Sequence, residues 1–225
     1  MRLIAHRGFD DEYPPNTVAA VRKAASRADM IELDVHRCRS GELVVAHNDI
    51  LDIDIDGITR VDDLTAAELA DLDAHEGEGI QTLEGVLDAI PADTAVNFEL
   101  KASECIDEAL RIARNAPNHV VVSSFDAETI HEASRDDEGV SLAYVLDATP
   151  TDDIEFAQSI DCEFVHPHTS VCLLTDLVTQ AHDAGMEVNA WTVDTRSAAW
   201  ALEQRGVDGV IASSPDVLDS SDGLL

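Results

Sequence analysis

Cations are scarce in this sequence, and lysine is almost missing. Only 14 of the 225 residues are Lys or Arg, and Lys23 and Lys101 are the two lysines, against 46 Asp and Glu. The formal net charge of −32 repels polyanions, which excludes non-specific nucleic-acid binding. Such a surface is typical of proteins from salt-rich cytoplasms, where molar salt screens charges within about 3 Å. We therefore expect a salt-adapted protein that is destabilised at low ionic strength.

The sequence also lacks long apolar runs and paired cysteines. No stretch approaches the roughly 18 to 20 apolar residues that a membrane helix needs. The opening residues 1–7 do not have the apolar centre of a secretion signal. We expect a soluble, cytoplasmic protein without stable membrane insertion. No C-x-x-C pair occurs, so we expect free, buried thiols at all four cysteines: Cys38, Cys105, Cys162 and Cys172.

What the sequence does contain is a regular alternation of short apolar runs and segments with helical spacing. The hydrophobic content of 45% suffices for a sizeable core, and no linker rich in Pro, Gly or Ser divides the chain. We expect one domain over residues 1–225. The apolar runs predict eight strands, at residues 3–5, 30–35, 95–100, 120–124, 141–145, 163–166, 187–191 and 209–212.

Helical segments fall between these strands. They cover residues 17–28, 83–90, 104–115, 127–135, 152–159, 175–184 and 197–205, with a last turn at 216–218. Asn16 is the expected N-cap of the first helix and Thr195 that of a later one. Eight β-then-α units in about 200 to 250 residues are typical of a TIM (β/α)8 barrel. An open doubly wound sheet is the alternative.

The segment 41–81 interrupts the alternation and predicts a small insertion after the second barrel strand. Residues 43–47 indicate an extra strand, and 64–72 a short helix that Thr65 caps, with Glu68 three residues on. The acidic stretch 49–57 lacks the ligand spacing of an EF-hand, so we interpret it as a solvated edge of the insertion.

Two strands carry acids that alternate with apolar residues. Glu32 and Asp34 are two positions apart on the second strand, so both face the barrel interior, and Glu99 repeats the pattern on the third strand. Ionised carboxylates that meet in a buried space need a cation, and oxygen ligands select Mg²⁺ or Ca²⁺ over zinc. Singly, an E-x-D pair is more often an ion pair or a solvated surface feature.

Histidines and cations end the same group of strands. His6 and His47 each follow an apolar run, and imidazoles with a pKa near 6.5 are suited to proton transfer at neutral pH. Arg7 and Lys101 lie beside them at strand ends, where their side chains can bind phosphate. Each histidine alone is more often structural. Together with a metal, the four residues describe a site for a phosphate ester.

At these residues the sequence resembles the glycerophosphodiester phosphodiesterase family. Its motifs H-R-G…P-E-N-T, E-L-D-V, V-V-x-H-D, T-L-E, N-x-E-L-K, S-S-F, W-T-V and G-V-D-G have counterparts here in the same order. The counterparts are His6-Arg7-Gly8 with Pro14-Pro15-Asn16-Thr17, Glu32-Leu33-Asp34-Val35, Val44-Val45-Ala46-His47, Thr82-Leu83-Glu84, Asn97-Phe98-Glu99-Leu100-Lys101, Ser123-Ser124-Phe125, Trp191-Thr192-Val193 and Gly206-Val207-Asp208-Gly209.

The resemblance implies a TIM barrel that hydrolyses small glycerophosphodiesters, derived from lipid head groups, to an alcohol and glycerol phosphate. It also implies attack by the substrate's own glycerol hydroxyl and a need for Mg²⁺ or Ca²⁺. The roles that it implies are acid–base catalysis by His6 and His47, phosphate binding by Arg7 and Lys101, a pocket wall at Trp191, and metal ligation by Glu32, Asp34 and Glu99. Which histidine is the base, which head group is cleaved, and the oligomeric state stay open.

The sequence departs from the family pattern at three places. Pro15 replaces a Glu, Asn48 replaces the Asp after the second histidine, and the ending 212–215 lacks the usual acidic T-D-x-P. Asn48 carries no charge to raise the pKa of a histidine, which predicts a shifted pH optimum. Pro15 and Asn48 keep open a non-catalytic protein that binds phosphate ligands. A related barrel phospholipase of the sphingomyelinase D or phosphatidylinositol type is the other rival.

Two other histidines and a tryptophan are assigned from their positions alone. His166 and His168 follow the sixth strand, so we expect a structural role or a contact with the substrate pocket, with metal binding as the alternative. Trp200 lies within a helical segment, and we expect it in the core.

Overall fold

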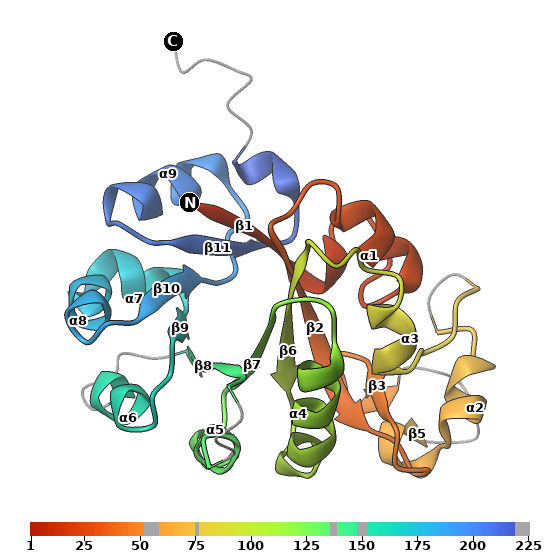
Figure 1. Ribbon diagram of the computed structural model, residues 1–225. Coiled ribbons are helices and arrows are strands. Elements are labelled where there is room, and N and C mark those ends of the chain that lie inside the picture. Colours follow the sequence, from red (N-terminus) through yellow and green to blue (C-terminus); the bar gives the residue numbers. More distant parts are fainter. Residues whose placement is uncertain (52–58, 75–76, 136–138, 148–152, 219–225) are drawn as a thin grey trace.

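Eight parallel strands close into a barrel in the computed structural model, which describes residues 1–51, 59–74, 77–135, 139–147 and 153–218 (Figure 1). The N-terminal strand pairs with both the next strand and the last one, which closes the ring. The predicted TIM barrel is therefore confirmed. Around the ring the strands are β1 (Arg2–Ala5), β2 (Met30–Arg37), β6 (Ala95–Leu100), β7 (Val120–Ser124), β8 (Ser141–Leu146), β9 (Phe164–Pro167), β10 (Glu187–Ala190) and β11 (Gly209–Ala212).

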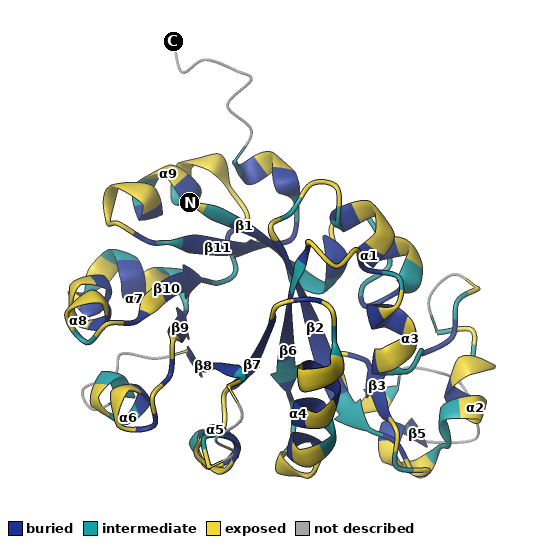
Figure 2. Cartoon of the chain, in the orientation of Figure 1, coloured by how far each residue is buried: buried dark blue, intermediate teal, exposed yellow. Residues whose placement is uncertain are grey.

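Helices lie outside the strands, and their buried faces are turned toward them (Figure 2). In α4 the buried residues Ile106, Ala109, Leu110 and Ala113 recur at intervals of three and four, which places them on one face. All the helical segments expected from the sequence form. They are α1 (Val18–Ala24), α3 (Leu83–Leu87), α4 (Ile106–Asn115), α5 (Ala127–Ala133), α6 (Asp153–Ser159), α8 (Leu177–Asp183), α9 (Arg196–Gln204) and the 3-10 turn η4 (Pro215–Val217).

One helix was not expected from the sequence: α7 (Thr169–Leu174) follows β9 directly. Its residues Thr-Ser-Val-Cys-Leu-Leu have no strong helical preference, and a side chain stabilises its start. Nδ1 of His168 accepts a hydrogen bond from the backbone N–H of Ser170 at 3.2 Å. Histidine is not among the residues preferred at the N-cap, so neither the cap nor the residues of this short helix predict it from the sequence.

The expected capping role of Asn16 is wrong. Thr17 is the N-cap of α1, and its hydroxyl accepts a hydrogen bond from the N–H of Ala20 at 3.1 Å. Asn16 has a left-handed backbone with φ of 61° and sends its side chain inward, where Nδ2 donates to Asp34 at 3.0 Å. Its role is therefore at the carboxylate and not at the helix end.

The expected core position of Trp200 is also wrong. On α9 the buried face is formed by Ala199 and Leu202, and Trp200 follows Ala199 by one position, about 100° further around the helix. As a result 57% of its surface is exposed. The position of an apolar residue in the helical repeat, and not the size of its side chain, decides whether it faces the barrel.

The insertion lies beside β2 and has its own small core. The extra strand is β3 (Leu43–Val45), antiparallel to β2, and Thr65 and Glu68 form a capping box at the start of α2 (Ala66–Ala70). A two-stranded ribbon of β4 (Ile50–Leu51) and β5 (Thr59–Arg60) leads into η2 (Val61–Asp63). Residues 52–58 of the acidic stretch lie outside the described residues. The core of the insertion consists of Cys38, Val44, Ala46, Val61, Leu69 and Ile80.

The inside of the barrel combines an apolar cluster with a few buried polar side chains, Asn97, Asn189 and His166 among them, and its charged residues gather at the carboxyl ends of the strands. An apolar cluster fills the interior with Ile4, Met30, Val121, Ala143, Phe164 and Ile211. The four cysteines are buried and unpaired, as expected. In the described part of the chain, no helix has the length and apolar character to span a membrane.

Candidate active site

The turn after β1 has an unusual backbone that presents two site residues. Arg7, Gly8 and Phe9 have φ values of 51°, 82° and 69°, three consecutive residues in the left-handed region. At Gly8 a Cβ atom would lie 2.8 Å from the Cβ of Ala20, so the turn packs directly against α1. Strained backbone of this kind concentrates at functional sites. Here it holds His6 and Arg7 at the rim of the barrel.

Three carboxylates meet above the apolar interior, as the strand alternation predicted. Glu32 and Asp34 project from β2, and Asp34 is paired in the sheet with Glu99 of β6. Both β2 acids are almost completely buried, at 2% and 1% exposure. Oxygen atoms from all three residues lie within 4.8 Å of one another, which is close enough for one metal ion to bind them together.

The charge of Asp34 is already balanced by neighbours. Nζ of Lys101 lies 2.6 Å from one carboxylate oxygen, and Nε of Arg7 lies 3.0 Å from the other. Lys101 also pairs with Glu99. Burial alone raises the pKa of the Asp34 carboxyl, but the two cations and the hydrogen bond from Asn16 outweigh it and hold that pKa below its usual value. Asp34 is therefore ionised.

Glu32, by contrast, forms no ion pair with Lys or Arg in the part of the chain that the structure describes. One of its oxygens accepts a hydrogen bond from the backbone N–H of Arg7 at 3.0 Å. The other, Oε1, is buried without a partner among the described residues. Burial and the adjacent charge of Asp34 raise the pKa of Glu32 to about 8. A hard divalent cation at the three carboxylates would satisfy this oxygen and restore the charged form, so the residues present fit a metal ion.

An aspartate that the sequence reasoning missed fixes the first histidine. Nδ1 of His6 lies 3.1 Å from Oδ1 of Asp10, and the hydroxyl of Ser213 is 3.5 Å from the same nitrogen. Burial lowers the pKa of His6, but the hydrogen bond with Asp10 and the charge of Glu32 outweigh burial and raise it. The spacing of four residues between His6 and Asp10 was the only signal in the sequence, and it is not specific.

The second histidine is in a different environment. His47 follows β3 and is more exposed, and its backbone oxygen lies 3.3 Å from Nε2 of His36. Partial burial of the ring lowers the pKa of His47, and the cations Arg7 and Lys101 lower it further. The charge of Asp34 and a weaker hydrogen bond with Asn48 oppose these effects without cancelling them. The surroundings therefore raise the pKa of His6 and lower that of His47.

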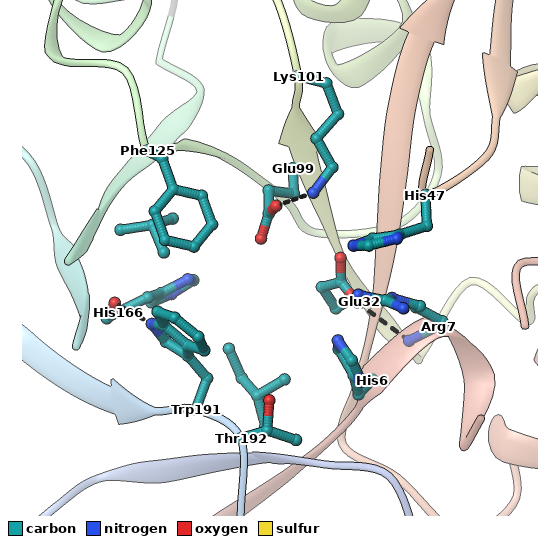
Figure 3. A pocket seen from close by; sticks show the side chains of 12 residues that line it. His6, Arg7, Glu32, His47, Glu99, Lys101, Phe125, His166, Trp191 and Thr192 are labelled. Carbon is teal, nitrogen blue, oxygen red and sulfur yellow. Dashed lines mark hydrogen bonds and ion pairs between the residues drawn. The ribbon is translucent and has the colours of Figure 1, made fainter. Parts of the chain in front are cut away.

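A cavity of about 150 Å³ joins these groups, and its two halves differ in chemistry (Figure 3). The charged residues and the histidines of β1, β2, β3 and β6 form one wall, and aromatic side chains form the other. Trp191 lies edge-on to Phe125, with ring centres 5.2 Å apart, and its Nε1 donates to the backbone oxygen of His166 at 2.7 Å. The structure thus brings seven of the sequence-predicted residues to one cavity: His6, Arg7, Glu32, His47, Glu99, Lys101 and Trp191. Asp34 does not line the cavity, but a carboxylate oxygen of Asp34 lies within 4.8 Å of those of Glu32 and Glu99.

The two histidines after β9 take separate places. His166 is buried and lines the cavity, opposite Glu32 in Figure 3. His168 caps α7, and its ring lies edge-on to Trp191 at 5.1 Å between ring centres. Neither belongs to the carboxylate cluster, the group of metal-ligating side chains found in the described residues.

Comparison with known proteins places this architecture in context. The model of the glycerophosphoryl diester phosphodiesterase family matches residues 6–105 and 98–217. A glycerophosphodiester phosphodiesterase of Caldanaerobacter subterraneus subsp. tengcongensis is 30% identical over 232 residues, which cover 96% of this chain and 95% of the relative. One of Bacillus altitudinis is 30% identical over 235 residues, with 96% and 95% covered.

Solved structures agree with the sequence comparison. A phosphodiesterase of Oleispira antarctica, in complex with the product sn-glycerol-3-phosphate, superposes with a TM-score of 0.88 at 27% identity, over 98% of this chain and 97% of that one. A glycerophosphodiester phosphodiesterase of Thermotoga maritima gives a TM-score of 0.84 at 25% identity, with 96% of each chain covered.

Proposed function

The chain belongs to the glycerophosphoryl diester phosphodiesterase family and is a phosphoric diester hydrolase, and from this membership we propose a metal-dependent reaction in the cavity described above. The products are an alcohol and glycerol phosphate. The observation that carries the proposal is a cluster of three carboxylates, two of which line the cavity together with His6, His47, Arg7 and Lys101. Among the described residues, one oxygen of Glu32 in this cluster has no partner. This set of groups matches what cleavage of a phosphodiester requires.

Glu32, Asp34 and Glu99 would hold the metal, Mg²⁺ or Ca²⁺. When bound, such an ion lowers the charge on the phosphoryl oxygens and orients the attacking hydroxyl. The supporting observation is that Glu32 Oε1 has no partner among the described residues, while Asp34 is held in place by Lys101 and Arg7.

His6 and His47 exchange the protons of the reaction. One imidazole removes the proton from the attacking hydroxyl as the new P–O bond forms. The other gives a proton to the alcohol oxygen as the old P–O bond breaks, so that the alcohol leaves neutral and a cyclic glycerol phosphate remains. In a second step the proton roles of the two imidazoles reverse: one removes a proton from water as its oxygen bonds to phosphorus, and the other protonates the glycerol oxygen as the ring P–O bond breaks, which gives glycerol phosphate. Asp10 orients the His6 ring through Nδ1 and leaves Nε2 for the substrate. The arrangement is the usual one for a histidine that carries a proton, because the carboxylate stabilises the imidazolium.

Arg7 and Lys101 bind the phosphate. The Lys101 ammonium has three N–H donors, and the carboxylates of Asp34 and Glu99 take two of them. The third donor is left for a phosphoryl oxygen in the cavity that Lys101 lines. Trp191, on the opposite wall, contacts the apolar parts of the substrate.

The proposed substrates are small glycerophosphodiesters derived from lipid head groups. The relative from Oleispira antarctica holds sn-glycerol-3-phosphate, and this chain resembles it over nearly its whole length. We further propose that the enzyme works in the cytoplasm. Four buried cysteines without a disulfide fit a reducing compartment.

The test is a coupled assay for glycerol phosphate over a panel of head groups in high salt, with EDTA and then with added Mg²⁺, Mn²⁺ or Ca²⁺. We expect release by the wild type with metal, none in EDTA, and none from His6→Ala or Glu32→Ala. Undiminished release in EDTA would contradict the metal site. No release under any condition would favour the rival of a phosphate-binding protein, and faster cleavage of intact lipid than of glycerophosphocholine would favour a phospholipase.

A further inference from the structure

A chain of polar side chains crosses the barrel interior beneath the cavity. It begins at Arg2, whose guanidinium pairs with Glu187 at 2.5 Å and lies over the ring of Phe164 at 5.4 Å. It continues through Asn189 to His166, and both of these side chains are buried, at 0% and 1% exposure. Buried polar chains of this kind fix the orientation of each member.

The direction of the hydrogen bonds follows from the first member. A guanidinium only donates, so the atom of Asn189 that lies 3.2 Å from Arg2 is the oxygen Oδ1. The amide nitrogen Nδ2 must then point the other way, to Nε2 of His166 at 3.1 Å. An amide nitrogen only donates, so Nε2 of His166 accepts and carries no proton.

The remaining nitrogen of His166 is therefore a donor. Burial, together with the charge of Arg2, lowers the pKa of His166 to about 3, so the ring is neutral and has a single N–H. With Nε2 unprotonated, that N–H is at Nδ1.

This donor is left without an acceptor. Nδ1 of His166 has no hydrogen-bond partner in the part of the chain that the structure describes. A buried, unsatisfied donor is unfavourable by about 1–3 kcal/mol, so such a group calls for an explanation. The explanation lies in its place, because the ring lines the cavity opposite the carboxylates (Figure 3). The Trp191 indole, bonded to the His166 backbone oxygen at 2.7 Å, helps to hold the residue there.

We propose that the Nδ1–H group of His166 donates a hydrogen bond to a hydroxyl oxygen of the substrate's glyceryl group, and so selects diesters that carry this group. The inference rests on the proposed function. A hydroxyl is favoured over a phosphoryl oxygen because the cations Arg7 and Lys101 lie with the carboxylates on the opposite wall. An uncharged donor in a buried setting matches an uncharged acceptor.

Two variants separate hydrogen bonding from packing. In His166→Asn the amide reaches the position of Nδ1 and keeps a donor there. In His166→Gln the longer amide reaches the position of Nε2, which keeps the contact with Asn189 but leaves no donor at Nδ1. The ligands are sn-glycerol 3-phosphate and propyl phosphate, which has the same chain without hydroxyls. Binding is measured by calorimetry with the metal present.

We expect His166→Gln to weaken binding of glycerol 3-phosphate about ten-fold and His166→Asn to weaken it less than about three-fold. Propyl phosphate should bind all three proteins within about two-fold. Equal losses in both variants, or parallel losses for both ligands, would overturn the inference. If the inference fails in this way but the wild type still releases glycerol phosphate from diesters, the proposed function stands. If the wild type releases none, the proposed function itself is refuted.

The tautomer is tested without any substitution. The ¹⁵N chemical shifts of the His166 ring should show a protonated Nδ1 and a bare Nε2 throughout the range of about pH 5 to 8. A ring protonated at Nε2, or one that titrates in this range, would overturn the inference even if neither variant folds.

Discussion

The Asp10 carboxylate holds the His6 ring at Nδ1, with 3.1 Å between the two atoms. This contact raises the pKa of His6 against the effect of burial. In Asp10→Asn the carboxylate charge is lost, so we expect the pKa of His6 to fall by roughly one unit or more. The limb of the pH profile of kcat/KM that His6 controls should then move to lower pH by the same amount.

The limb that moves also assigns the role of His6. A shift of the acidic limb means that His6 acts as the base, and a shift of the basic limb means that it acts as the acid. The matched control is Asp11→Asn, because Asp11 is the exposed neighbour. A profile of Asp10→Asn that coincides with the wild type at saturating metal would contradict the prediction.

Metal-free protein should lose stability as the pH rises, because of Glu32. Its carboxyl ionises near pH 4.5 in an unfolded chain but only near pH 8 in the folded one, so the neutral form that stabilises the fold is lost across this range. Glu32→Gln stays neutral at every pH. In EDTA at about pH 8.5 we expect this variant to melt several degrees above the wild type, since about 1 kcal/mol shifts Tm by roughly 2–4 °C in a domain of this size.

The same variant should be inactive with metal, which separates stability from function. Exposed Glu163 supplies the control substitution, Glu163→Gln, with neither effect. If Glu32→Gln and the wild type have the same Tm in EDTA at every pH, ionisation of Glu32 does not destabilise the metal-free fold, and the prediction is wrong.

The two lysines of the chain provide a matched pair. Lys101→Met removes the cation shared by Asp34 and Glu99 and a donor to the phosphate, so we expect activity to fall by about 10²- to 10³-fold. Lys23→Met, at an exposed site on α1, should leave the rate unchanged. Rates are measured with glycerophosphocholine and saturating metal. A loss of less than about three-fold for Lys101→Met would argue against a role in phosphate binding.

Gly8 and Gly41 both have positive φ angles, of 82° and 101°, but different surroundings. Around Gly41 nothing lies within 4 Å of an added Cβ, so Gly41→Ala should cost only about 1 kcal/mol of unfolding free energy. At Gly8 the new Cβ would lie 2.8 Å from that of Ala20. We expect Gly8→Ala to cost at least about 2 kcal/mol more and to lower kcat, because the turn carries His6. Denaturant unfolding of both variants tests this, and equal losses would contradict it.

Salt should stabilise this protein strongly. With a net charge of −32, self-repulsion is screened only at high ionic strength. We expect Tm to rise by roughly 10 °C between about 0.1 M and about 3 M KCl. Replacing three exposed acids, Glu155, Glu163 and Glu203, with Gln should reduce this slope. A Tm independent of KCl would discard the idea of salt adaptation.

Strand alternation explains why much of the site was predictable. On a strand the direction of a side chain alternates with its position, so the sequence alone predicts that Glu32, Asp34 and Glu99 share one space. The sheet register then brought Asp34 and Glu99 side by side. Sequence motifs spaced along the chain supplied the remaining residues, because the carboxyl ends of all barrel strands share one rim.

Contacts that depend on torsion angles or on remote partners could not be predicted in this way. The tautomer of His166 depends on Asn189, 23 residues away, and on Arg2, which is 187 residues from Asn189. Asp10 reaches His6 only because of a left-handed turn between them. Trp200 shows the same limit on a helix, where a shift of one position along the sequence moves a side chain from the core to the solvent.

The pairing of β1 with β11 has a consequence for biosynthesis. Ser213, which follows β11, lies 3.5 Å from His6 although 207 residues separate them. During synthesis, the edge of β1 that pairs with β11 stays unpaired until the roughly 200 residues between the two strands have been translated. The turn that carries His6 can therefore be completed only after the rest of the barrel has been synthesised, although it is made before the other strands of the barrel.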